Sequence, residues 1–401
     1  MRKFVRFFSR SILSLEKKSS KSTPKKVYLG RPSNNLTSGI VGLANVGKST
    51  FFQAITNSTL GNPANYPFAT IEPEEARVVV KSAKLDHLAN LFQSEKKIPA
   101  SLSIVDIAGL TRNAARGEGL GNKFLSDIRQ VDGIFQVVRG FRDDEIIHIE
   151  KNIVDPVRDL EIVSDELMLK DMDFVESAIE RTTKSLKKPG IDKVYAQLEI
   201  STLGKVLEGL YEGKKVSVGE WNNEEVEILN THNFLTAKPT VFLLNVNEQD
   251  FLAQKNEFKE GVEDWVKKHS PGDEVVLFSG AYEKEIAGTE LDSKSALPYI
   301  THCMRSVLRL ISFFTCGPVE AHQWTIREGS TAPEAAGSIH TDLQKTFISA
   351  QIYKYSDLEV ESAPLEEARL KSKGRQLRVG KTYLMEDGDV MLVKAAGGKS
   401  R

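Results

Sequence analysis

This 401-residue chain contains the run GLANVGKST at Gly42–Thr50, which matches the pattern G-x-x-x-x-G-K-[ST]. Glycines in this pattern let backbone N–H groups turn inward around phosphate groups, and the helix that follows adds a favourable dipole. The run lies between a strand expected over Thr37–Gly42 and a helix expected to begin at Phe51. It therefore predicts a nucleoside triphosphate site, with contacts from Asn45, Val46, Gly47, Lys48, Ser49 and Thr50.

Two residues of this run have chemical roles beyond cradling phosphates. We expect Lys48 to neutralise β- and γ-phosphate oxygens and the Ser49 hydroxyl to ligate Mg²⁺. Asp106, at the end of an expected strand, and Thr70, in a proline-containing loop, complete the expected metal shell, and the Gly109 N–H can meet the γ-phosphate. The predicted catalytic residues are thus Lys48, Thr70 and Gly109, and the predicted metal ligands are Ser49, Thr70 and Asp106. This set resembles the loops of GTPase switches, which order around the γ-phosphate.

One position departs from signalling GTPases. Those proteins place a glutamine after the Asp-x-x-Gly motif to orient the attacking water, whereas this chain has Leu110 there. Hydrolysis then needs another device, or it is intrinsically slow. The side-chain oxygen of Asn45 could hold a monovalent cation such as K⁺ beside the phosphates. Alternatively, Asn45 only stabilises the loop by bonding its backbone, and the sequence leaves both readings open.

The expected base site differs from that of guanine-specific enzymes. Such enzymes carry Asn-Lys-x-Asp, whose aspartate accepts hydrogen bonds from N1–H and N2–H₂ of guanine, but this chain has Asn-Val-Asn-Glu at 245–248. A site that depends on such hydrogen bonds loses much of its preference for guanine when the acceptor is misplaced. Adenine needs only a carbonyl or amide oxygen, which Asn245 or the Val246 backbone can supply. We therefore expect ATP to be preferred to GTP, with a GTP-specific enzyme as the alternative, and a base site at Asn245, Val246, Glu248, Ser279, Gly280 and Ala281.

The rest of the chain contains segments with three different sequence patterns. Apolar runs at 133–139, 240–245 and 274–279, separated by helical stretches, predict a doubly wound α/β sheet. From residue 155 to about 212 the chain is charged and poor in glycine, and the run KKPGI interrupts its helical periodicity, which predicts an inserted antiparallel helical hairpin. Short β-rich runs from about Thr315 predict a small α+β module.

Charge is unevenly distributed. Residues 1–26 hold nine Lys or Arg and one acid, a net charge of +8, whereas the whole chain is −1. This Arg- and Ser-rich, amphipathic composition is typical of a mitochondrial transit peptide. The alternative is a basic disordered tail on a cytoplasmic protein. No apolar run is long enough to predict a membrane span, and two cysteines, Cys303 and Cys316, are too few for a disulfide framework or a paired zinc site.

Several longer runs resemble the Obg-like ATPase (YchF) family. They are GIVGLANVGKST, NYPFATIEP, VDIAGL, GEGLGNKFL, NVNE, FFTCGP, AHQWTIREGSTAPEAAGSIHTD and DGDVM, and the resemblance spans residues 36–395. Two features depart from the family pattern. Ala44 replaces the usual proline of the phosphate loop, and the basic extension suggests a mitochondrial paralogue.

The resemblance implies a domain organisation and a function. It implies a G-type P-loop domain at 36–154 and 238–314, an inserted helical hairpin and return at 155–237, and a TGS domain of β-grasp type at 315–396. It also implies a molecular switch that hydrolyses ATP better than GTP, with a ribosome or translation factor as partner. The remaining alternative is a ribosome- or RNA-associated binding protein with a regulatory nucleotide site, although the acidic body lacks a basic aromatic stripe. Direct DNA binding is not expected.

Overall fold

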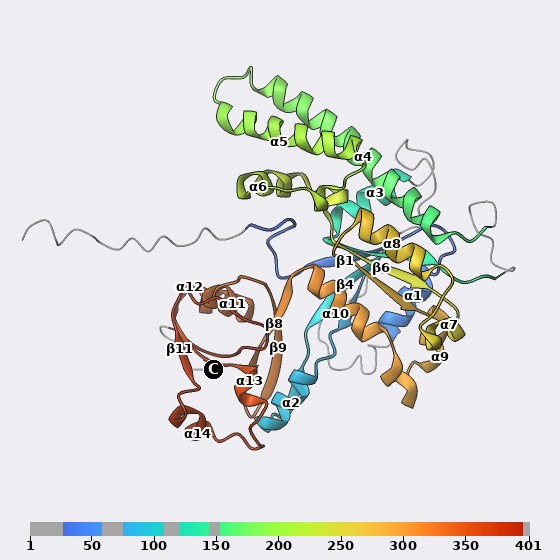
Figure 1. Ribbon diagram of the computed structural model, residues 1–401. Helices are drawn as coiled ribbons and strands as arrows, with labels where there is room; N and C mark the ends of the chain where they lie inside the picture. The colour runs from blue at the N-terminus through green and yellow to red at the C-terminus, as the bar shows by residue number, and fades with distance from the viewer. Residues whose placement is uncertain (1–26, 58–74, 108–120, 144–152, 396–401) are drawn as a thin grey trace, which may run out of the picture.

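The computed structural model describes residues 27–57, 75–107, 121–143 and 153–395. These residues form three parts, which Figure 1 shows as an α/β domain, a helical hairpin that projects from it, and an orange-to-red C-terminal domain. The expected targeting segment, residues 1–26, lies outside the described residues.

The α/β domain is built on a six-stranded sheet with the order β2-β4-β1-β5-β6-β7. Strand β2 runs antiparallel to β4, and the other neighbours are parallel. The bounds are β1 Thr37–Val41, β2 Glu75–Val79, β4 Ser101–Asp106, β5 Gly133–Arg139, β6 Thr240–Asn245 and β7 Glu274–Phe278. Every residue of β5 and β6 is buried, as expected for central parallel strands covered on both faces.

Helices cover the two faces of this sheet. Along β6, Val241 and Leu243 belong to one hydrophobic cluster, whereas Phe242 and Leu244 belong to another, because side chains alternate across a strand. The first cluster includes residues of α1 and α10, and the second includes residues of α7 and α8. The helix bounds are α1 Lys48–Asn57, α3 Gly121–Gln130, α7 Glu248–Ala253, α8 Lys259–His269, α9 Gly280–Ile286 and α10 Leu297–Val307.

The hairpin consists of α4, Pro156–Ser185, and α5, Lys193–Tyr211. Its helices begin at aspartate caps: Asp155 accepts a hydrogen bond from the Arg158 N–H, and Asp192 accepts from the first turn of α5. Their seam buries aliphatic residues, and the chain returns to the sheet through α6, Asn223–His232. The short 3₁₀ turns η3, Val216–Val218, and η4, Leu235–Ala237, flank α6.

The C-terminal domain is built on a second sheet, with the order β11-β10-β12-β8-β9-β3, in which β3 is the short strand Lys96–Ile98. Of the strands after residue 309, the first and the last, β8 and β12, are parallel neighbours, and β8 pairs antiparallel with β9, an arrangement of the β-grasp type. The strands are β8 Leu310–Cys316, β9 Glu320–Arg327, β10 Phe347–Tyr353, β11 Leu377–Val379 and β12 Val390–Ala395. The helices are α11 Ala332–Ile339, α12 Thr341–Lys345, α13 Tyr355–Leu358 and α14 Glu367–Ser372.

Two segments lie differently from the expected domain boundaries. Strand β8 begins at Leu310, before the boundary expected at 315, because α10 ends at Val307 and runs into β8 almost without a linker. Helix α2, Ala83–Leu91, and strand β3, Lys96–Ile98, fall in the range assigned to the first domain, yet β3 pairs with β9 of the C-terminal sheet. Among the described residues, no helix is long and apolar enough to cross a membrane.

Candidate functional site

The phosphate loop joins β1 to α1, and its two motif glycines are needed for steric reasons. A Cβ on Gly42 would lie 2.4 Å from the carbonyl oxygen of Val137 on the neighbouring strand. Gly47 has a φ of +101°, and a Cβ there would lie 2.2 Å from Nδ2 of Asn245. The loop can therefore reach this position against β5 and β6 only with glycine at both places.

Lys48, the first residue of α1, is buried within this loop. Its side chain lies against the backbone, where Nζ donates a hydrogen bond of 2.7 Å to the Leu43 carbonyl. Burial lowers the pKa of Lys48 to about 8, and the charge of Asp106 partly opposes that shift. Among the described residues this neutral carbonyl is the hydrogen-bond acceptor for the ammonium group, and phosphate oxygens would offer it a much stronger one.

Ser49 and Asp106 meet beside the loop, although 57 positions separate them in the sequence. Ser49 Oγ donates to Asp106 Oδ2 over 3.3 Å, because α1 begins and β4 ends at the same edge of the sheet. A hydroxyl and a carboxylate are the hard oxygen donors that Mg²⁺ prefers, so the residues present fit that ion. The other expected members of this site, Thr70 and Gly109, lie outside the described residues, as does Leu110.

Asn45 adopts a left-handed backbone conformation, with a φ of +63°, and its side chain is exposed. Asparagine tolerates this conformation better than most residues. The turn alone thus supplies a reason for asparagine at this position, and the cation hypothesis is left as a prediction.

The carboxamide of Asn245 is committed to bonds within the protein. Nδ2 donates to the Val46 carbonyl over 3.0 Å, and Oδ1 accepts from the Gly280 N–H over 3.1 Å. Asn245 therefore ties the phosphate loop to the loop after β7, and its contact with the base stays a prediction. Sequence reasoning could not find these bonds, because they depend on the approach of β1, β6 and β7.

The other expected base-site residues divide into buried and exposed groups. The Val246 side chain is buried among apolar residues and its N–H donates to the Phe278 carbonyl over 2.9 Å, so its own carbonyl is the group that could face a base. Ser279 is fully buried and caps α9. Thr50 packs against Gly280, whereas Glu248, at the first turn of α7, and Ala281 are exposed. Adenine contacts would thus come from backbone groups and from Glu248.

Arg139 is a residue of this region that the sequence did not single out. It ends β5 beside Asn245 of β6, and its side chain is only 1% exposed. The guanidinium donates to the carbonyls of Phe141 and Asp143, over 3.1 and 3.0 Å. It therefore fixes the path of the chain after β5, and its only sequence signal is a single arginine at the end of an apolar run.

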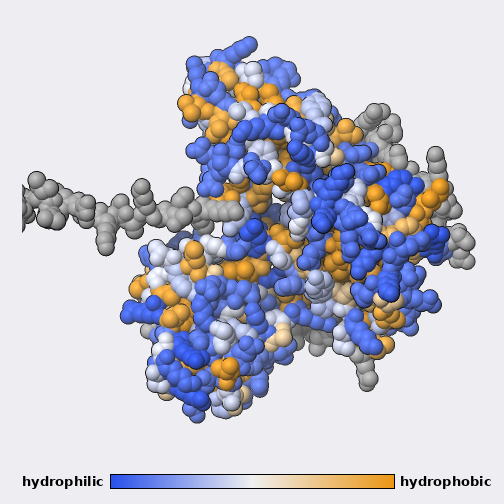
Figure 2. All heavy atoms as spheres, in the orientation of Figure 1, coloured by the Kyte–Doolittle hydropathy of each residue, from blue (hydrophilic) through white to orange (hydrophobic). Residues whose placement is uncertain are grey.

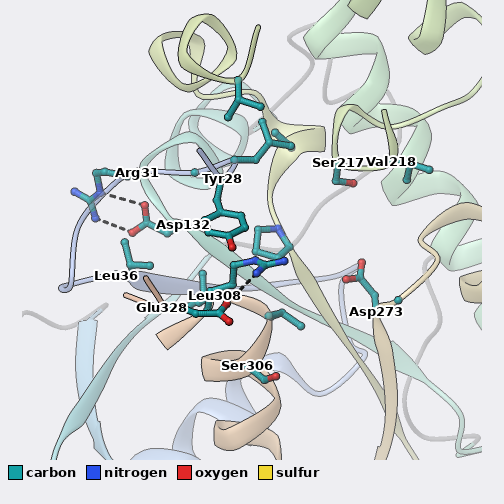
Figure 3. A pocket seen from close by; sticks show the side chains of 18 of the residues that line it. Tyr28, Arg31, Leu36, Asp132, Ser217, Val218, Asp273, Ser306, Leu308 and Glu328 are labelled. Atoms are coloured by element: carbon teal, nitrogen blue, oxygen red, sulfur yellow. Dashed lines mark hydrogen bonds and ion pairs between the residues drawn. The ribbon is translucent and has the colours of Figure 1, made fainter. Parts of the chain in front are cut away.

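A separate cavity of about 690 Å³ lies away from the phosphate loop. It is lined by the segment that precedes β1, by the hairpin return, by the turn before β7, and by the ends of α10 and β9, and Figure 2 shows the molecule hollowed between these lobes. Figure 3 shows Arg31 bonded to Asp132 across one side of it, with the shorter contact at 2.6 Å. Two ion pairs, Arg31–Asp132 and Arg309–Glu328, occupy charged groups of this cavity, and it contains no residue of the phosphate loop, so we assign the nucleotide site to that loop.

The fold and the phosphate loop define a P-loop nucleotide hydrolase of the GTPase type. Two family models agree: one described as "50S ribosome-binding GTPase" matches residues 37–170, and one for the C-terminal domain of YchF GTPases, described as "protein of unknown function", matches 310–396. The chain is 54% identical to an Obg-like ATPase homolog of Saccharomyces cerevisiae, over 93% of this chain and 98% of that protein. Obg-like ATPase 1 of the same yeast is 49% identical, over 94% and 98%.

A solved structure also matches. The Schizosaccharomyces pombe YchF GTPase has a TM-score of 0.83 and 46% identity, and the match covers 92% of this chain and all of that one. The chain belongs to the YchF/Obg-like ATPase family, which confirms the resemblance and the fold class inferred from the sequence. The relatives carry both ATPase and GTPase in their names, so family membership does not fix the preferred base.

Proposed function

We propose that this protein is a Mg²⁺-dependent molecular switch that hydrolyses ATP in preference to GTP. The observation that carries the base preference is the loop Asn245–Glu248, where Asn245 is occupied in bracing other loops and the last position is glutamate. A guanine base would need a carboxylate matched to both of its donors. Adenine would need only a backbone acceptor such as the Val246 carbonyl.

The described residues suggest how the site acts on a triphosphate. Lys48 would leave the Leu43 carbonyl and bind phosphate oxygens, while backbone N–H groups of the loop hold the remaining oxygens. Ser49, Asp106 and Thr70 would hold Mg²⁺, which supplies neutralisation of the phosphate charge when bound. The site has to position the attacking water without a glutamine at Leu110, so we expect slow turnover.

Competition binding tests the base preference. We expect full-length protein in Mg²⁺ to bind ATP at least about tenfold more tightly than GTP, a difference of about 1.4 kcal/mol. Glu248→Asp should narrow this ratio, since the shorter carboxylate restores the guanine acceptor. Glu260→Asp is the matched control, because Glu260 occupies the first turn of α8 as Glu248 occupies that of α7. Tighter binding of GTP than of ATP by the unaltered protein would overturn the proposal in favour of a GTPase.

A link to translation is the second part of the proposal. The family model that matches residues 37–170 carries the description "50S ribosome-binding GTPase", and this supports a ribosomal partner. Co-sedimentation with ribosomes in ATP, ADP or a non-hydrolysable analogue tests it, and indifference to the nucleotide would count against a switch.

From the composition of residues 1–26 we also propose mitochondrial import. Microscopy of a tagged full-length chain, compared with a tagged chain that lacks these residues, would test it.

A further inference from the structure

Residues 81–99 leave the nucleotide-site sheet between two adjacent strands and return to the same point. Val79 of β2 pairs with Ser101 of β4, and the Val80 N–H donates to the Ala100 carbonyl over 2.8 Å. The base of this excursion is therefore closed by sheet hydrogen bonds. Its body, formed by α2 and β3, lies against the C-terminal domain (Figure 1).

Apolar packing joins the excursion to that domain. Leu85, Leu88 and Leu91 of α2 are buried, with exposed fractions of 4% or less, in one hydrophobic cluster with residues of β8, β9, β10 and β12. The cluster members from the C-terminal domain are Phe314, Ala321, Tyr353, Leu358, Leu370 and Val390. A surface this apolar would be costly to expose, so the excursion should move with the C-terminal domain as one body.

Directional bonds fix the register of the same interface. The N–H groups of Glu95 and Lys96 donate to the carbonyls of Pro318 and Val319 over 2.9 and 3.1 Å. The Ser94 hydroxyl donates to the Gly317 carbonyl over 2.7 Å. Lys84 pairs with Asp387 at 2.6 Å, and the Leu365 N–H donates to the Leu91 carbonyl over 2.9 Å, so bonds cross the interface at both α2 and β3.

The other ends of the two strands lie at the nucleotide site. Strand β4 ends at Asp106, which contacts Ser49 of the phosphate loop, and β2 begins at Glu75, five positions after Thr70 in the sequence. In switch proteins the loops that carry such residues rearrange with the γ-phosphate. A shift of the β2–β4 edge would therefore be carried into the C-terminal domain through the excursion.

The C-terminal domain has a second attachment elsewhere on the α/β domain. Helix α10 packs against the core of the α/β domain and leads into β8 of the C-terminal domain. Arg305, near the end of α10, donates to Thr325 and Ser312 over 3.0 and 2.8 Å. A body held at two separate places turns when one attachment moves relative to the other. The arrangement can thus convert a small shift of β2 and β4 into a rotation of the C-terminal domain.

We propose that residues 81–99 are a rigid connector that couples the phosphate state of the nucleotide site to the orientation of the C-terminal domain. The proposal rests on the proposed function, because it needs a triphosphate at the phosphate loop. Coupling between two sites acts equally in both directions. A substitution that loosens the connector must therefore also change the ratio of the nucleotide site's affinities for triphosphate and diphosphate.

Hydrogen–deuterium exchange and nucleotide titration on the same full-length protein test the connector. A non-hydrolysable ATP analogue with Mg²⁺ should change amide exchange at 94–98 and 317–322 relative to ADP. Lys84→Ala combined with Ser94→Ala should shift the ratio of analogue to ADP affinity by about fivefold or more, the usual scale of coupling between sites. The matched control is Lys373→Ala with Ser338→Ala, which removes an ion pair and a hydroxyl-to-carbonyl bond of similar geometry inside the C-terminal domain.

The outcomes separate the connector from the function on which it rests. Analogue binding with unchanged exchange at both segments, or equal effects of the two double variants on the affinity ratio, would overturn the connector and leave the nucleotide site intact. Failure of both nucleotides to bind the unaltered protein would overturn the proposed function, and the connector with it.

Discussion

The side-chain nitrogen of Asn245 lies 3.0 Å from the carbonyl oxygen of Val46, and this bond ties the end of β6 to the middle of the phosphate loop. The same carboxamide accepts a hydrogen bond from Gly280. Phosphate binding and base binding are therefore properties of one braced unit. Loss of these two Asn245 hydrogen bonds should lower the affinity for every nucleotide, whichever base it carries.

Asn245→Ala tests the brace. We expect ATP and GTP affinity to fall together by about tenfold or more, because two buried hydrogen bonds are lost and the Val46 carbonyl is left without its donor. Equilibrium titration measures this. Asn230→Ala is the control. Asn230 Nδ2 donates a hydrogen bond of 3.0 Å to the Tyr28 carbonyl, and this bond lies outside the nucleotide site. Loss of ATP affinity with GTP affinity unchanged would instead show that Asn245 serves chiefly to contact the adenine base.

The monovalent-cation hypothesis concerns Asn45. We predict faster ATP hydrolysis in K⁺ than in Na⁺, and Asn45→Gly should remove the difference. Glycine accepts the φ of +63° found at this position, so the variant keeps the loop conformation and loses only the carboxamide. Equal rates in the two salts would leave Asn45 with its backbone role alone.

The root of the hairpin contacts α3, and Arg129 supplies the contact. Its guanidinium lies 4.4 Å from the ring centre of Phe174 and donates to the His232 carbonyl over 3.3 Å. We expect Arg129→Ala to cost about 1–2 kcal/mol of stability and to lower the thermal midpoint by about 2 °C or more. Arg181→Ala is the matched control, because Arg181 is exposed and lies farther from the same ring, at 5.8 Å. Indistinguishable midpoints for the two variants would show that Arg129 does not secure the hairpin.

Asp273, labelled in Figure 3, gives a prediction about pH. Burial raises the pKa of Asp273 to about 6, with Lys215 and the Thr240 N–H opposing the shift. The usual pKa of an aspartate is 3.8, so between about pH 3.8 and pH 6 the folded state binds more protons than the unfolded state. The protonated carboxyl group therefore stabilises the fold at low pH, and this stabilisation is lost as the pH rises through 6.

Comparison of Asp273→Asn with the unaltered protein isolates this contribution. The variant lacks the buried charge at any pH. Its stability relative to the unaltered protein should be greater at pH 7 than at pH 4.5 by about 1–2 kcal/mol, the value expected for a shift of this size after allowance for partial exposure. Denaturant unfolding at the two pH values measures it, and a difference that does not depend on pH would contradict the raised pKa.

Much of this architecture could be read from the sequence because the signals are local. The phosphate loop, the apolar strands and the hairpin each occupy one continuous stretch with its own periodicity. Strand β3 gave no such signal: it has three residues, and its partner β9 begins at Glu320, more than two hundred positions later. Its assignment to the C-terminal sheet follows only from tertiary packing of α2.

The segment before β1 illustrates the same limit. The Gly30 N–H donates to Asn230 of α6 over 2.8 Å, and Asn34 accepts from the Arg327 N–H of β9 over 3.0 Å. This short segment thus touches the hairpin return and the C-terminal domain. Nothing in its composition names those partners, because one carboxamide can bond any backbone group that the fold brings near.

The decisive measurement is steady-state hydrolysis by the full-length protein in Mg²⁺, with ATP and GTP in parallel and Lys48→Ala as the comparison. The lysine serves the phosphates from within a loop and contributes one hydrogen bond to the Leu43 carbonyl, so the variant should keep its fold by circular dichroism. We predict slow turnover with a higher kcat/KM for ATP than for GTP, and loss of both activities in Lys48→Ala. An undiminished rate in Lys48→Ala, or a higher kcat/KM for GTP, would contradict an adenine-selecting hydrolase at this phosphate loop.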